Sequence, residues 1–360
     1  MSVRAGSVTA LYLFDVAEEI DLAAVPRLLQ TTAAQARLAP KPFTPAYVQY
    51  RVPPIVMDGD GLSLPGLGPL RARLKVFDYG VLSLALTQSV SGSWDALAAV
   101  GHDLATKEDQ ARAWADQVRG QLEPCLIKGR APHLSEDYFI YTVTELEREM
   151  TAEVLLAQEG GAIASLLRGE REPLSRQEQD DALRHRISYL ASDLVVPTWN
   201  AAFVLDTETG AQASLEIFEY ANSQLLQFRY YDDRLDSELE RIYDSIEDSH
   251  WFDVLGGRRY VRAAQQLHAL FIEVNELTDK TENALKMVGD VYAARLYALV
   301  ASRLGLDRWK GNVEEKLDTL DDIYRFTVEQ TQMSRGHLLE LTVVLILVIE
   351  LVLVFMGIMK

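Results

Sequence analysis

The chain has 360 residues, 48% of them hydrophobic, and a formal net charge of −18 at pH 7. The apolar content excludes intrinsic disorder as the main state, and the length is enough for about two domains. The negative charge repels phosphate backbones and no run of basic residues offsets it, so direct nucleic-acid binding is not expected. A single cysteine, Cys125, excludes an internal disulfide.

The first part of the chain, residues 1–206, switches repeatedly between an apolar period of two and a period of 3.6. This pattern is typical of mixed α/β or α+β structure. Strands are predicted at 8–14, 47–52, 73–86 with a break at Gly80, 137–143 and 199–205. Helices are predicted between them at 21–37, 93–121 in two pieces, 144–158 and 175–194, the last with Ser175 and Glu178 spaced as a capping box. We therefore expect residues 1–206 to form an α+β soluble body that is ferredoxin-like in part.

From residue 207 to 336 the sequence predicts a long helical stalk. Glycine and proline become rare within three segments, 211–248, 259–304 and 313–341, whose apolar residues recur every three or four positions. In the third segment this spacing forms a heptad seam that includes Leu317, Leu320, Tyr324 and Leu338. The seam fits an intramolecular antiparallel hairpin or an intermolecular coiled coil, and both can occur in one assembly. We expect the chain to form a homo-oligomer with these residues in contact.

The last segment, residues 337–360, has the composition of a membrane anchor. Residues 341–359 are apolar except for Thr342, Glu350 and Gly357, and at ~1.5 Å per residue they span about 28 Å, one bilayer core. Positive charge beside the segment favours the cytoplasmic side, and the N-terminus lacks the features of a signal peptide. These patterns predict a tail-anchored, single-pass protein of the inner (cytoplasmic) membrane whose body faces the cytoplasm.

Glu350 lies at the middle of this apolar segment. A carboxyl group in such surroundings is costly and usually faces protein, water or a partner group. Three explanations are open: a protonated carboxyl group that hydrogen-bonds between helices of an oligomer, a site for ion or proton conduction, or a contact with a polar group of a partner protein. We expect the first, so Glu350 joins the predicted oligomerisation residues.

The sequence carries none of the common signatures of catalysis. Phosphate-binding loops, dinucleotide-binding glycine patterns, zinc-hydrolase motifs and nucleophile elbows are all missing. The six histidines are scattered without a metal-binding pair, and no motif surrounds Cys125, which is interpreted as a small buried hydrophobic residue. No catalytic, cofactor-binding or metal-binding residues are predicted, and we expect the protein not to be an enzyme.

Five short strings stand out in combination: LDRW at 306–309, KLD at 316–318, HLLE at 337–340, ILVIE at 346–350 and, more weakly, VFDYGV at 76–81. They resemble the family of the "required for meiotic nuclear division" protein, a family with a domain of unknown function. The resemblance implies a membrane-anchored, bacterial-type member without an established catalytic activity. Its mitochondrial relatives sit on the inner membrane, face the matrix and support organellar translation. This chain departs from them in its acidity and in lacking a transit peptide.

Together these patterns predict a membrane-anchored oligomeric scaffold or tethering protein. Its expected partners are the lipid bilayer, further copies of itself, and another membrane or cytoplasmic protein. Two alternatives are open. One is a membrane-bound hydrolase or nuclease that uses acidic residues of the N-terminal body, which carboxylates converging in one deep pocket would favour. The other is a small channel or transporter subunit that uses Glu350.

Overall fold

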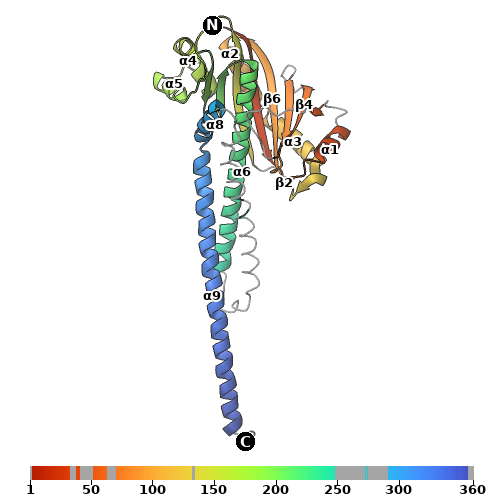
Figure 1. Ribbon diagram of the computed structural model, residues 1–360, viewed down its shortest axis with the longest axis vertical. Helices are drawn as coiled ribbons and strands as arrows, with labels where there is room; N and C mark the ends of the chain where they lie inside the picture. The colour runs from red at the N-terminus through yellow and green to blue at the C-terminus, as the bar shows by residue number, and fades with distance from the viewer. Residues whose placement is uncertain are drawn as a thin grey trace. The chain divides into compact units, whose positions relative to one another are not determined.

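The computed structural model describes residues 2–32, 38–40, 52–62, 70–131, 134–247, 272, 274 and 291–355 (Figure 1). The chain divides into two compact units. Unit 1 comprises Met1–Tyr230 and Lys280–Trp309, and unit 2 comprises Tyr231–Asp279 and Lys310–Lys360. The domain boundaries at 206 and 336 that were inferred from the sequence stay predictions.

Unit 1 is built on a mixed sheet, to which the described residues contribute eight strands in the order β3-β4-β5-β6-β1-β8-β10-β9. Neighbouring strands are antiparallel, except that β10 runs parallel to β8. Two further strands, β2 (Glu19–Ile20) and β7 (Leu126–Ile127), pair separately. The strands of the large sheet are β1 (Val3–Asp15), β3 (Leu38–Pro40), β4 (Ile55–Leu62), β5 (Leu70–Val76), β6 (Val81–Gly92), β8 (Ser135–Leu146), β9 (Leu194–Pro197) and β10 (Ala201–Leu205).

The main core lies between this sheet and a layer of helices. Alternate residues of β1, including Val8, Tyr12 and Phe14, point into it, as the period of two requires. Because β6 and β8 both run antiparallel to β1, they are parallel to each other, and the helices that connect them cross over β1. The helices of the layer are α1 (Val25–Thr32), α2 (Trp94–Ala105), α3 (Glu108–Leu122), α4 (Ala152–Arg168) and α5 (Arg176–Ala182), with the short 3-10 helix η1 (Glu123–Cys125) after α3.

The opposite face of the sheet contacts helix α6 (Glu208–Glu247), with α8 (Val291–Leu304) beside it. The ring of Tyr138 on β8 stacks on Phe218 of α6 with centroids 5.4 Å apart. On the α6 side of β1, Leu11 and Leu13 are fully buried. Both faces of the central strands are therefore covered, which explains why β1 reads as a continuous apolar run.

The mixed α/β class predicted from the sequence is confirmed, and several elements agree closely. The break at Gly80 separates β5 from β6, and the two pieces of 93–121 are α2 and α3. At α5, the Ser175 hydroxyl accepts a hydrogen bond from the Glu178 backbone N–H at 3.2 Å, as the capping spacing indicates. The helix predicted at 175–194 is too long, because α5 ends at Ala182. The strand predicted at 47–52 lies almost wholly outside the described residues.

Two of the three predicted long helices can be compared with the structure. Helix α6 covers the first, and α9 (Leu306–Phe355) covers the third. Most of the second lies outside the described residues, and its last part is α8. The coiled coil itself stays a prediction.

The C-terminal membrane anchor is a wrong prediction. Among the described residues, no helix is both long enough and apolar enough to cross a bilayer. Residues 356–360 lie outside the described residues. The anchor at 337–360, the tail-anchored topology and the inner-membrane localisation are corrected accordingly.

Burial of Tyr141 on β8 gives the fold a measurable sensitivity to alkali. Desolvation raises the pKa of its phenol to about 12, whereas the unfolded chain ionises near its ordinary value of about 10. The folded state thus keeps a proton that the unfolded state releases, and the stabilisation is complete below pH ~10 and lost as the pH rises towards 12.

We expect Tyr141→Phe to remove this contribution. Between pH ~10 and ~12 its unfolding free energy should fall less steeply than that of the unmutated protein, by up to about 1.4 kcal/mol per pH unit. Urea titrations over this range measure the difference. Equal slopes for the two proteins would contradict the assignment.

Candidate functional site

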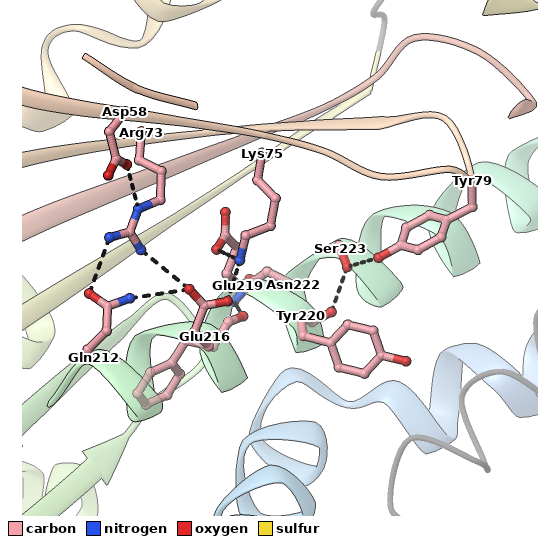
Figure 2. Close-up of polar contacts among 11 residues, drawn as sticks. Asp58, Arg73, Lys75, Tyr79, Gln212, Glu216, Glu219, Tyr220, Asn222 and Ser223 are labelled. Carbon is pink, nitrogen blue, oxygen red and sulfur yellow. Dashed lines mark hydrogen bonds and ion pairs between the residues drawn. The ribbon is translucent and has the colours of Figure 1, made fainter. Parts of the chain in front are cut away.

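A strand of basic residues faces α6 across the interior of unit 1. Arg71, Arg73 and Lys75 alternate along β5, so all three side chains leave the same face of the sheet. On α6, Gln212, Glu216 and Glu219 recur at spacings of four and three, which places them on one side of the helix. We call Asp58, Arg73, Lys75, Gln212, Glu216 and Glu219 the charge layer; Figure 2 shows their contacts.

Lys75 lies at the buried end of the charge layer. Its ammonium group donates hydrogen bonds to Glu216 and Glu219 (Figure 2), and Lys75 and Glu219 are 1% and 0% exposed. Burial alone would lower the pKa of Lys75, but the attraction of the two carboxylates and their hydrogen bonds outweigh it and hold that pKa above its ordinary value. Lys75 is therefore a fixed positive charge, and the pair of carboxylates depends on it for neutralisation.

Arg73 continues the charge layer towards solvent. Its Nε lies 3.1 Å from the Asp58 carboxylate on β4. Its two terminal nitrogens reach Glu216 Oε1 and Gln212 Oε1, each at 3.3 Å. One guanidinium group thus joins two strands and a helix, so the register of α6 along β5 is set by directional contacts as well as by apolar packing.

Farther along α6, more buried polar side chains bind the body. The hydroxyls of Ser223 and Tyr79 lie 2.7 Å apart (Figure 2). Gln227 donates to the fully buried carboxylate of Asp15 at 3.3 Å. Arg130 binds the same carboxylate with two nitrogens, and its guanidinium lies 3.7 Å from the centroid of the Tyr230 ring. The face of α6 towards the sheet is therefore polar along several turns, and these side chains bind specific partners in the body.

A groove of about 680 Å³ opens at the solvent end of the charge layer. It lies where β1, β5 and β6 extend past the first residue of α6, Glu208. Its charged lining residues are Arg4, Arg71 and Glu208, and its hydroxyl-bearing lining residues are Ser7, Thr87, Ser89, Ser91 and Thr144. The groove is thus continuous with β5, whose exposure increases from Lys75 through Arg73 to Arg71.

The residues predicted for oligomerisation all lie in α9. Leu317 and Leu320 are buried, at 5% and 2% exposure, within unit 2. Between them and α6, Lys316 Nζ lies 2.7 Å from both Asp232 and Asp236, so α9 packs on α6 in that unit. The side chains of Tyr324, Leu338 and Glu350 lie outside the described residues. A role for these five in oligomerisation stays a prediction.

Comparison with known proteins assigns the chain to a family. Residues 5–212 match the family model described as "Uncharacterized protein MJ0711, N-terminal domain". The chain belongs to this family. A relative that carries the MJ0711 name, from Methanocaldococcus jannaschii, is 25% identical over 228 residues, which cover 63% of this chain and 68% of the relative. No solved structure matches the chain.

The resemblance to the "required for meiotic nuclear division" family is therefore wrong. The matching MJ0711 domain contains the sheet, its helical layer and the first turn of α6, whereas four of the five strings that suggested the resemblance lie at 306–350. The fifth, at 76–81, is the tight turn between β5 and β6. Its aromatic and glycine pattern has a local cause, because Phe77 stacks on Tyr79 and Gly80 has φ +84°.

Proposed function

We propose that this protein is an oligomeric scaffold whose chains assemble through the C-terminal part of α9. The observation that carries the proposal is a run of exposed apolar side chains. Six residues of this run are each between 50% and 58% exposed: Val343, Val344, Ile346, Leu347, Val348 and Ile349. We call them the apolar segment of α9. Contiguous exposed apolar surface of this kind marks an interaction site.

Other copies of the same segment are the proposed occupant. Successive helical residues lie about 100° apart, so the apolar segment is apolar on every side, and such a helix is normally buried all round. A single partner helix would cover one side only, which supports an assembly of three or more chains. When the copies are parallel, the apolar segments of all chains lie at the same height. A closed symmetric bundle then buries every one of these segments.

The finer features of the scaffold are part of the same proposal. The heptad spacing that continues through Tyr324 and Leu338 supports a coiled coil leading into the bundle. Glu350 is proposed to hydrogen-bond between copies. A ferredoxin-like arrangement of part of the body is supported by the parallel strands β6 and β8, whose connection passes over β1.

The scaffold is proposed to act without catalysis. Converging carboxylates in a pocket would favour the hydrolase alternative. Two carboxylates that converge inside unit 1, those of Glu216 and Glu219, bind the buried ammonium group of Lys75. Among the described residues that line the groove, Glu208 is the one acid, and general acid–base chemistry by paired carboxylates needs two.

Sedimentation velocity of the full chain tests the proposal. We expect a trimer or larger species, and the double variant Val344→Lys with Leu347→Lys should dissociate it. These positions share one side of the helix. Burying a valine or leucine side chain contributes about 1.5–3 kcal/mol. Losing two of them should therefore raise the dissociation constant of the assembly roughly a hundredfold or more. The matched control, Tyr189→Lys with Leu190→Lys, alters two exposed apolar residues of unit 1 and should leave the assembly unchanged.

Two outcomes would overturn the proposal. The unmutated chain could sediment as a monomer in the absence of detergent. The second outcome concerns what covers the apolar segment. If the unmutated chain co-sediments with phosphatidylcholine vesicles as a monomer, and the double variant does not co-sediment, then lipid is the occupant of the apolar segment.

A further inference from the structure

The groove at the start of α6 has a floor of hydroxyl groups. Thr87, Ser89 and Ser91 alternate along β6 and leave the same face of the sheet. Ser7 on β1 pairs directly with Ser89. Farther along, α6 packs on this face of β5 and β8. The helix begins at Glu208, and the hydroxyls line the groove beside its first residue. Each can both donate and accept hydrogen bonds.

Two arginines of the groove differ from the other cations of the same face. Arg73 and Lys75 are held by carboxylates. Arg4 and Arg71 are exposed, and among the described residues neither guanidinium group has an ion-pair or hydrogen-bond partner. In a chain with a net charge of −18, two unpaired guanidinium groups that line one groove form a local positive site. Their planar forks match carboxylate and phosphate groups.

The two arginines lie at opposite ends of the hydroxyl row. Arg71 pairs with Thr87 across β5 and β6, whereas Arg4 lies on β1 between residues that pair with Gly92 and Val90. Two strand spacings and about four residues separate them, which is on the order of 15 Å between Cα atoms. Because arginine side chains are long, the two guanidinium groups can lie closer together than the Cα atoms, and a molecule with two or more acidic groups can contact both.

We propose that this groove binds a small molecule that carries two or more carboxylate or phosphate groups. Arg4 and Arg71 bind the terminal acidic groups, and the hydroxyls of β6 and β1 bind the polar atoms between them. Glu208 lies against the groove with a charge of the same sign as the ligand, so it weakens binding of a pure polyanion. The proposal is independent of the scaffold function, because the groove lies in unit 1 and the apolar segment of α9 lies in unit 2.

Isothermal titration of the full chain at low ionic strength tests this site. Citrate is the carboxylate probe, inorganic tripolyphosphate is the phosphate probe, and acetate is a control with one acidic group. We expect saturable binding of citrate or tripolyphosphate with one site per chain, and weaker binding of acetate. Whichever probe binds more tightly identifies the acidic group that the groove prefers.

Variants distinguish the groove from unspecific charge attraction. Arg71→Gln and Arg4→Gln should each weaken binding about tenfold or more, since each removes a charge-assisted hydrogen bond. Glu208→Gln should strengthen it several-fold. Arg176→Gln removes the same charge from an exposed position on α5 and should have no effect. All four sites are exposed, so melting temperatures should not change. Absence of binding at millimolar probe, or equal losses for Arg71→Gln and Arg176→Gln, would overturn the proposal.

Discussion

Replacing Lys75 by methionine should lower the free energy of unfolding by about 3–5 kcal/mol. The variant keeps a side chain of similar length but leaves the carboxylates of Glu216 and Glu219 facing each other without their shared cation. Both carboxylates are buried, at 6% and 0% exposure, so water cannot replace the ammonium group. Urea unfolding at neutral pH, followed by circular dichroism, measures the loss.

A matched substitution and a rescue make this prediction specific. Lys128 binds Glu18 at 2.7 Å on the surface, where 63% of its side chain is exposed, and Lys128→Met should cost less than about 1 kcal/mol. Adding Glu216→Gln and Glu219→Gln to Lys75→Met should recover much of the loss, because the buried negative charges disappear with the cation. If Lys75→Met and Lys128→Met cost the same, the charge layer does not stabilise the fold as described.

Gly80→Ala should destabilise the protein by about 3 kcal/mol or more. A Cβ atom at Gly80 would lie 1.8 Å from the backbone oxygen of Ala17, and the residue has φ +84°. The obstacle is main chain, and it is held in place because the Val16 N–H donates to the Gly80 carbonyl and the Ile20 N–H donates to the Asp78 carbonyl. The substitution must therefore break the contact between the β5–β6 turn and the segment after β1.

The control for this variant is another glycine with positive φ. Gly169 at the end of α4 has φ +64°, and nothing lies within 4 Å of a Cβ placed there. Gly169→Ala should show the conformational cost alone, about 1 kcal/mol. Thermal and urea unfolding of the two variants side by side separate the steric contribution from the conformational one. Equal losses would mean that the turn moves freely.

The sequence predicted those parts of the fold whose signals are local. Gly80 marks the tight turn, and Ser175 with Glu178 marks the start of α5, because a turn or a cap is specified by a few adjacent residues. Strand β9 has no such local signal and was not predicted. Its apolar run at 194–197 is short, and periodicity alone cannot distinguish so short a strand from the end of a helix.

The charge layer could not be predicted, because its partners are far apart in the chain. Lys75 lies 141 and 144 residues from the two carboxylates that bind it. The alternation of Arg71, Arg73 and Lys75 was a visible signal that one face of a strand is basic, but only the topology shows that α6 covers it. The groove depends on the same topology, since it exists where α6 begins. At the C-terminus, composition identified an apolar segment but not what covers it.

The position of β1 at the centre of the sheet has a consequence for synthesis of the chain. Every residue from Val8 to Asp15 is buried in the folded protein, yet the partners of β1 are β6 and β8, which end at Gly92 and Leu146. At about 5–20 residues per second, a ribosome needs roughly 4–15 s after completing β1 to finish β6, and roughly 7–26 s to finish β8. Until β6 is complete, the nascent chain carries an apolar strand with both edges unpaired, and until β8 is complete one edge stays unpaired. An unpaired apolar edge is a template for aggregation. Nascent chains stalled before residue 92 should therefore bind chaperones that recognise extended apolar segments, and chains stalled well beyond residue 146 should release them.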